Sequence, residues 1–319
     1  MRSRCFILIT LAFLLLFPLL SVSAQEMSDD ELRSFLDKVD EQAKRYTELF
    51  RDLTATETRV DELFDRRERR TIMRTVESDL VVLESRVDGA VQEYLIVRKV
   101  DGRPIRNSDR RALSFLSKLS KATSSKSELQ QLQSENLRHV IGIRYYGYIL
   151  SPLIVTSANL APFLEFTVSG SESADGHDVL IIDYRQVKQT PDIAFEINAP
   201  SELKVREAVL SGRMWVSKEN HQLFRLEERV MLISERFSEP FCFLFRNVTF
   251  RQSRFDINVP AKMIWETYSP ILDRKVVRRT DDQLSPGSRV NARSVSAFGE
   301  FERFNVEVRS AETENTDKK

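Results

Sequence analysis

Residues 204–233 read KVREAVLSGRMWVSKENHQLFRLEERVMLI, and this stretch decides the fold. Branched and aromatic residues fill the segments 204–217 and 222–233, and the turn-forming pair Glu219-Asn220 separates them. Two strands joined by so short a turn must pair antiparallel, because a parallel pair needs a crossover of a dozen residues or more. The stretch is therefore predicted to be an antiparallel hairpin.

The same β pattern continues on both sides of this hairpin. Alternation with a period of two begins near Thr54 and is interrupted by a predicted turn at 66–70 and another at Asp101-Gly102. Further strands are predicted at 72–82, 91–97, 162–169, 178–187, 241–255, 259–268, 273–281 and 294–309. The chain is thus expected to form one large antiparallel meander, which will coil and expose an apolar concave face.

Two helical blocks interrupt the strands. SDDE at residues 28–31 has the form of a capping box, and apolar residues then recur three or four apart, which predicts an amphipathic helix over 28–53. Its polar face mixes both charge signs, so packing on the protein's own sheet is favoured over binding to a membrane. A helical insert is predicted over 107–142. The fold class is α+β, with both helical blocks covering the concave face.

The N-terminus has the pattern of an export signal. Arg2 and Arg4 precede an apolar run at 6–20 and small residues at 21–24, so residues 1–24 are interpreted as a cleaved signal peptide. The run is shorter than the ~20 residues that a membrane-spanning helix needs. We expect a mature chain that begins near Gln25 and is periplasmic or secreted, without a stable membrane span. A single domain over 25–309 and a polar tail over 310–319 are expected.

The composition argues against a polyanionic partner and against an internal disulfide. Lys plus Arg and Asp plus Glu both number 48, a balance that gives no support to nucleic acid or another polyanion as partner. After cleavage, Cys242 would be the only cysteine, so no internal disulfide is expected. Its apolar neighbours in the predicted strand indicate a buried, unreactive thiol.

Catalytic and metal-binding motifs do not stand out. The three histidines, His139, His177 and His221, share no metal-ligand spacing, and no glycine-rich phosphate-binding loop is present. The adjacent Glu227 and Glu228 must point to opposite faces of a strand, so surface charge and ion pairing are expected of them. No cofactor and no enzymatic activity are expected. The weakest alternative is a hydrolase built around His177, for which no activated nucleophile is recognisable.

Aromatic residues recur on the predicted strands, and a packed core is their simplest interpretation. In the stretch 241–250, however, both faces are apolar: Phe243 and Phe245 lie on one face, and Leu244 and Val248 on the other. Helices can cover one face, and a bound apolar ligand could share that role. The side chains that we expect to contact such a ligand are Trp215, Phe224, Phe243 and Trp265.

The central hairpin also resembles a known family. GRMWVS at 212–217 followed by HQLFRLE at 221–227 is similar to the hairpin of bacterial proteins related to the LolA and LolB lipoprotein carriers of the outer membrane. ADGHDVLIIDYR at 174–185 resembles the preceding strand of that family, and FGEFERFNV at 298–306 resembles its closing strand. The resemblance, mainly over 160–309, implies an incomplete barrel whose apolar hollow is lidded by helices and receives acyl chains. It implies no catalytic residues.

Two functional hypotheses follow. The first is an exported, non-enzymatic protein with a half-barrel fold, which holds a lipid, a lipoprotein acyl chain or another apolar ligand in its hollow. The alternative is an interaction or structural protein of the cell envelope, in which the hollow is filled and an edge strand or surface patch contacts a protein partner. The two hypotheses differ in whether the hollow is open.

Overall fold

The computed structural model describes residues 27–84, 91–108, 110, 139–143, 155–157, 159–189, 204–235, 239–270 and 288–303. The helix is α2 (Asp29–Phe50), and the strands are β1 (Leu53–Phe64), β2 (Arg70–Glu84), β3 (Val91–Val100), β4 (Arg103–Pro104), β5 (Leu164–Ala174), β6 (His177–Gln186), β7 (Val205–Ser217), β8 (Leu223–Ser234), β9 (Phe241–Gln252), β10 (Asn258–Pro270), β11 (Ser288–Phe298) and β12 (Glu302–Arg303). A short 3-10 helix, η2 (Ala161–Phe163), precedes β5. The predicted signal peptide, the strand at 273–281, the polar tail and most of the insert at 107–142 lie outside the described residues.

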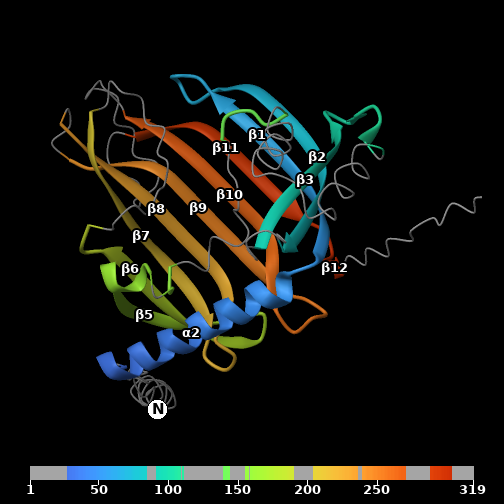
Figure 1. Ribbon diagram of the computed structural model, residues 1–319. Coiled ribbons are helices and arrows are strands. Elements are labelled where there is room, and N and C mark those ends of the chain that lie inside the picture. Colours follow the sequence, from blue (N-terminus) through green and yellow to red (C-terminus); the bar gives the residue numbers. More distant parts are fainter. Residues whose placement is uncertain are drawn as a thin grey trace, which may run out of the picture.

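All twelve strands belong to one antiparallel sheet (Figure 1). Its order is β4-β3-β2-β1-β11-β10-β9-β8-β7-β6-β5, and β12 pairs with the end of β1. The chain starts in the middle of the sheet at β1, winds outward to β4, resumes at the opposite edge with β5, and meanders back to β11. There β11 pairs with β1, with Val295 opposite Val60.

The sheet curves strongly without closing in the part of the chain that the structure describes (Figure 1). Among the described strands, the two edges β4 and β5 each have a single neighbour. The predicted fold class, a large curved antiparallel sheet of the incomplete-barrel type with an N-terminal helix, is confirmed. The turn predicted at Asp101-Gly102 is present. Both residues adopt the positive φ angles that such a turn requires, 50° and 74°.

Helix α2 begins at the predicted capping box. The Ser28 amide donates to Oε2 of Glu31 at 2.8 Å, and the Glu31 amide donates to Oγ of Ser28 at 3.4 Å. The helix ends at Phe50 rather than at Leu53, because Asp52 adopts a φ of 61° and Leu53 already begins β1. The buried stripe of the helix consists of Leu32, Phe35, Val39, Ala43, Tyr46 and Phe50.

This stripe packs on one face of the sheet, which we call the inner face, and joins the main hydrophobic core there. The Phe35 ring lies 4.9 Å from the His221 ring in the β7–β8 turn, and the Phe50 ring lies 5.1 Å from the Phe301 ring after β11. Helix α2 therefore runs across one end of the sheet (Figure 1). The expected cover of the concave face is present at that end.

A short strap, residues 139–143, lies on the inner face over β1 and β11. Arg59 donates to the Ile143 carbonyl at 2.5 Å, and the Ile141 amide donates to Oδ2 of Asp61 at 3.2 Å. Gly142 has a φ of 75°, and a Cβ there would lie 2.8 Å from Leu63 and 3.0 Å from Ala292, so only glycine fits. These contacts hold the strap in an irregular conformation, whereas the sequence predicted helix up to 142.

Candidate functional site

The inner face of the central strands is an apolar floor. Five residues that are direct neighbours across β6 to β10 form one row, and each is at most 1% exposed. They are Ile182, Met214, Leu226, Val248 and Met263. A parallel row four residues further along β7 to β9 contains Leu210, Val230 and Leu244, which are also buried. The floor is continuous across the middle of the sheet.

A single charged row divides this floor. Glu228 on β8 and Arg246 on β9 face each other, with Oε1 and Nη2 2.9 Å apart, and both side chains are almost fully buried. The Arg246 guanidinium also lies 5.1 Å from the centre of the Trp265 ring on β10. A buried ion pair is tolerated only when its charges are matched, so each partner fixes the position of the other. The ion pairing expected of Glu228 is therefore present, but its expected place on the surface was wrong, because Glu228 lies on the inner face and is 2% exposed.

Tyr184 completes the charged row from β6. Its neighbour on β7 is Gly212, and the tyrosine ring lies over this glycine, where any Cβ would collide with it. The hydroxyl reaches the Glu227 carbonyl at 3.3 Å and Oε2 of Glu228 at 3.5 Å. Burial, followed by the charge of Glu228, raises the pKa of Tyr184 well above its ordinary value, so the hydroxyl stays protonated.

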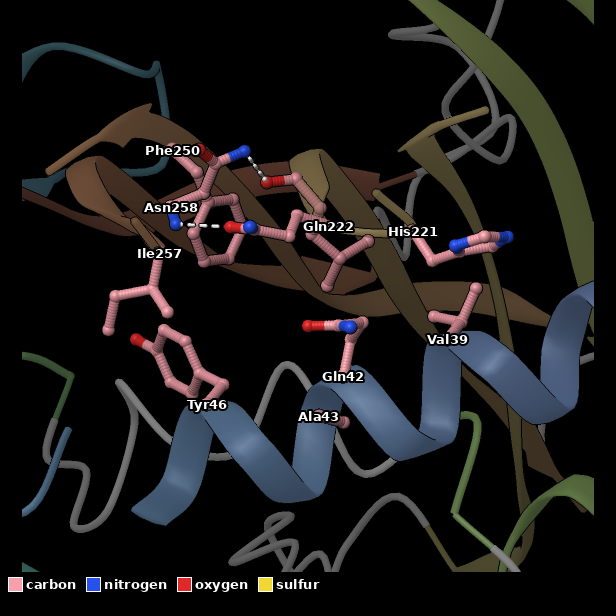
Figure 2. Close-up of a pocket in the computed structure, with 10 residues that line it drawn as sticks. Val39, Gln42, Ala43, Tyr46, His221, Gln222, Phe250, Ile257 and Asn258 are labelled. Carbon is pink, nitrogen blue, oxygen red and sulfur yellow. Dashed lines mark hydrogen bonds between the residues drawn. The ribbon is translucent and has the colours of Figure 1, made fainter. Parts of the chain in front are cut away.

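A small pocket lies between α2 and the sheet end that the helix covers (Figure 2). Its walls come from the helix and from the β7–β8 and β9–β10 turns, and the lining residues are Val39, Gln42, Ala43, Tyr46, His221, Gln222, Leu223, Phe250, Ile257 and Asn258. The cavity has a volume of about 20 Å³. That volume admits a water molecule or one oxygen-bearing group, and an acyl chain would not fit within it.

Hydrogen bonds within the turns shape the far wall of this pocket. The Asn258 amide donates to Oε1 of Gln222 at 2.6 Å, and Nε2 of Gln222 donates to the Asp256 carbonyl at 2.9 Å. Nδ2 of Asn258 donates to the Leu223 carbonyl at 3.0 Å. Burial, with a contribution from Lys38, lowers the pKa of His221, which favours its neutral form. The pocket wall is therefore polar but uncharged.

The outer face of the sheet is covered in a different way. Trp215 and Phe224 form a separate small cluster there with Val179, and the His177 ring lies 5.3 Å from that of Phe224. The guanidinium of Arg225 lies 4.6 Å from the centre of the Trp215 ring. Charged side chains thus lie directly over the aromatic ring.

The four side chains that were expected to contact a ligand do not come together. Trp265 lies on the inner face beside the charged row, and Phe243 is partly buried against the main core. Trp215 and Phe224 lie on the outer face. The sequence missed the pairing of Glu228 with Arg246, although an arginine in phase with Leu244 and Val248 was a signal that could have revealed it.

A reactive thiol and a metal site were the remaining possibilities for chemistry in this chain. Burial raises the pKa of the Cys242 thiol to about 12, and its Sγ donates to the Leu244 carbonyl at 3.5 Å. Among the residues that the structure describes, no three His, Cys, Asp or Glu side chains form a group that could hold a metal ion. Within the same residues, no helix is both long and apolar enough to cross a membrane.

No family model and no curated protein matches the sequence. A DUF1329 family protein from Desulfovibrio piger is 11% identical, with 86% of this chain and 94% of that chain covered and a TM-score of 0.31. A LolA superfamily protein from Nitrosomonas europaea is 12% identical, with 86% and 93% covered and a TM-score of 0.28.

A third solved structure, described as an outer membrane lipoprotein-sorting protein domain from Vibrio parahaemolyticus, is 8% identical to the chain. It has a TM-score of 0.29, with 84% of this chain and 91% of that chain covered. Two of these solved structures are thus described as a LolA superfamily protein and a lipoprotein-sorting protein domain.

Proposed function

We propose that the protein is an exported, non-enzymatic binding protein that holds an acyl chain, or another apolar ligand, on the inner face of its half-barrel. The observation that carries this proposal is the apolar floor, which extends over five neighbouring strands from Ile182 to Met263. Its residues are at most 1% exposed, so an acyl chain would bind there by displacing the segments that cover them. The motifs that resemble the lipoprotein carriers favour the same ligand class. Trp265, at the edge of that floor, is the contact that we assign first, with Phe243 second.

Hydrophobic burial is strong enough for such binding. A chain of ~16 carbons offers about 0.8 kcal/mol per buried methylene, an upper limit near ~12 kcal/mol before the costs of association. About two-thirds of that limit corresponds to micromolar affinity. The charged row would then lie beneath the chain, where its matched charges need no ligand counter-charge.

The two tryptophans of the chain provide a direct test, because they lie on opposite faces of the sheet. The Trp215→Phe variant keeps only Trp265 on the inner face, and the Trp265→Phe variant keeps only Trp215 on the outer face. A bromine-labelled fatty acid should quench the emission of Trp265 with saturation and leave that of Trp215 unchanged. Equal quenching of both residues, or none of either, would contradict the proposal.

A second candidate is the envelope interaction protein with a filled hollow. It is favoured by β5, an edge strand of 11 residues that has one neighbour among the described strands, because the free edge of a sheet can pair with a strand of a protein partner. Gentle purification followed by native mass spectrometry separates the two candidates: a co-purifying lipid supports the carrier, and a co-purifying protein without lipid supports the alternative.

N-terminal sequencing of the protein from its host tests export, with a start near Gln25 expected.

A further inference from the structure

The two ends of the half-barrel differ in charge. Helix α2 crosses one end of the sheet and contains seven Asp or Glu residues against four Lys or Arg residues. The turn between β1 and β2 lies at the other end, because β1 begins beside the end of α2 and extends away from it for 12 residues (Figure 1). In residues 65–73, four arginines stand against two carboxylates. The neutral balance of the whole chain therefore hides a local segregation of charge.

The tip of the β1–β2 hairpin is held in a defined shape by Asp65. Its carboxylate accepts hydrogen bonds from the Arg67 and Arg69 amides at 2.8 and 3.0 Å, and it forms an ion pair with the Arg69 guanidinium at 2.8 Å. Arg70 forms an ion pair with Glu62 at the same distance, 2.8 Å. Two of the four arginines are thus neutralised by carboxylates of the hairpin itself.

The other two arginines, Arg66 and Arg67, lie at the extreme end of the turn. Both are exposed, and neither side chain has a hydrogen bond or an ion pair with the described part of the chain. Glu68 beside them is exposed as well and offsets part of their charge. Two guanidinium groups are therefore available to an anionic partner, and their forked geometry suits phosphate oxygens.

The same hairpin exposes apolar side chains. Ile72 and Met73 are 48% and 52% exposed, and because they are consecutive in β2 their side chains point to opposite faces of the hairpin. The other exposed large apolar side chains among the described residues are Val187 and Val205. These lie just after β6 and at the start of β7, which are strand ends remote from α2 because the β7–β8 turn contacts the helix. Apolar exposure is thus concentrated at the end of the sheet opposite α2.

We propose that the tip of the β1–β2 hairpin, residues 65–73, docks the protein on the surface of an anionic phospholipid bilayer. Arg66 and Arg67 bind the phosphate-bearing headgroups, and Ile72 and Met73 enter the apolar part of the interface beside them. The acidic helix α2 is repelled by the same surface, which turns the hairpin toward the membrane. This docking surface goes beyond the proposed function and does not depend on the ligand of the inner face.

The small size of the tip favours a bilayer over a protein partner. A stable protein interface takes roughly 20–30 residues from each side, whereas the tip comprises the nine residues 65–73. A bilayer needs no matching shape, and each arginine near an anionic surface adds its own attraction. Insertion of a narrow hairpin would bury the apolar side chains on both of its faces, but a flat protein surface would cover only one face.

Flotation of the purified protein with lipid vesicles tests this surface. At about 0.05 M salt, the protein should float with vesicles of phosphatidylcholine that contain about 30% phosphatidylglycerol, and it should stay unbound with pure phosphatidylcholine. Arg66→Ala/Arg67→Ala should lower binding to the anionic vesicles by about ten-fold or more, because both attractive charges are lost. Ile72→Ser/Met73→Ser should lower it by about five-fold or more, because less apolar surface is buried.

Two further variants are matched controls. Arg66→Lys/Arg67→Lys keeps both charges and should bind within about two-fold of the parent. Arg33→Ala/Arg45→Ala removes two exposed arginines from α2, at the opposite end of the sheet, and should not weaken binding. Thermal unfolding of every variant should match the parent, because all the substituted side chains are exposed.

The outcomes separate docking from ligand binding. Absence of binding to anionic vesicles, equal binding to both kinds of vesicle, or full binding by the alanine or the serine double variant of the tip would overturn the docking surface. The quenching of Trp265 by the bromine-labelled fatty acid should be the same in the tip variants as in the parent. A failure of docking with normal quenching therefore leaves the acyl-binding function intact, and docking without quenching leaves the docking surface intact.

Discussion

The inner and outer faces of the sheet are both rich in apolar residues, yet they are buried by different means. The inner face is covered by other segments of the chain, namely α2 at one end and the strap over β1 and β11. The outer face is covered by its own arginines, with Arg225 over Trp215 and Arg229 over Phe245 at 5.1 Å. These contacts account for the burial of Trp215 and the partial burial of Phe245 on the outer face without a ligand.

The ion pairs of the two faces also differ in how far they are buried. Glu228 and Arg246 on the inner face are 2% and 3% exposed, so water screens their attraction very little. The side chains of Arg213 and Asp183 on the outer face are 39% and 40% exposed, although they also form an ion pair. Exposed pairs contribute little to stability, whereas a buried charge that loses its partner is strongly destabilising. Substitutions on the two faces should thus differ sharply in their effects.

The largest effect is expected from Glu228→Leu. The substitution leaves the buried Arg246 guanidinium without its partner, which should lower the free energy of unfolding by about 3–5 kcal/mol. Urea unfolding followed by circular dichroism measures this change. The double variant Glu228→Leu/Arg246→Met removes both charges and should recover most of the loss. A loss below about 1 kcal/mol in the single variant would mean that the inner-face pair behaves like an exposed pair.

A smaller loss, about 2–3 kcal/mol, is expected from Gly212→Ala. The new methyl group would collide with the ring of Tyr184 and with the Glu227 carbonyl on the adjacent strand. Gly170→Ala is the matched control, because a Cβ there meets only Ile181, at 3.9 Å, and stability should change by less than about 0.5 kcal/mol. If thermal unfolding showed equal losses for both variants, close packing of Tyr184 over Gly212 would not be the cause.

The smallest effect is expected on the outer face, from Arg225→Ala. This variant loses the contact with Trp215 and the ion pair with Glu227, but the Arg225 side chain is 42% exposed. The free energy of unfolding should fall by less than about 1 kcal/mol. Urea unfolding at low and high salt provides the measurement. A loss above about 2 kcal/mol would show that outer arginines stabilise the sheet as strongly as inner charges.

Much of this fold could be predicted from local patterns. The capping box at Ser28 and the three-and-four spacing after it predicted α2 closely, because both signals are contained within the helix itself. Turn residues such as Asp101-Gly102 and Glu219-Asn220 predicted the reversals in the same way. The period of two then identified most strands, since burial alternates along β8 and β9.

The candidate site depends on register, which the local patterns do not contain. Met214, Trp215 and Val216 are all buried, and the β7–β8 register shifts between Trp215 and Val216, so strand phase could not assign Trp215 to a face. The pair of Glu228 and Arg246 exists because β8 and β9 place these two residues opposite each other. The pocket joins α2 to turns near His221 and Ile257, far along the chain.

The order of strands in the sheet also has a consequence for the time course of folding. On the inner face, Ser296 of β11 donates to Oε1 of Glu57 on β1 at 2.5 Å, across a sequence separation of 239 residues. Such a long separation adds little to the equilibrium cost of closure, since each doubling of loop length costs only ~0.6 kcal/mol. It does slow the search for native contacts. The hairpin of β1 and β2 therefore keeps one edge of β1 unpaired until β11 has been synthesised. During that interval a newly made molecule is most prone to pair with a neighbouring molecule.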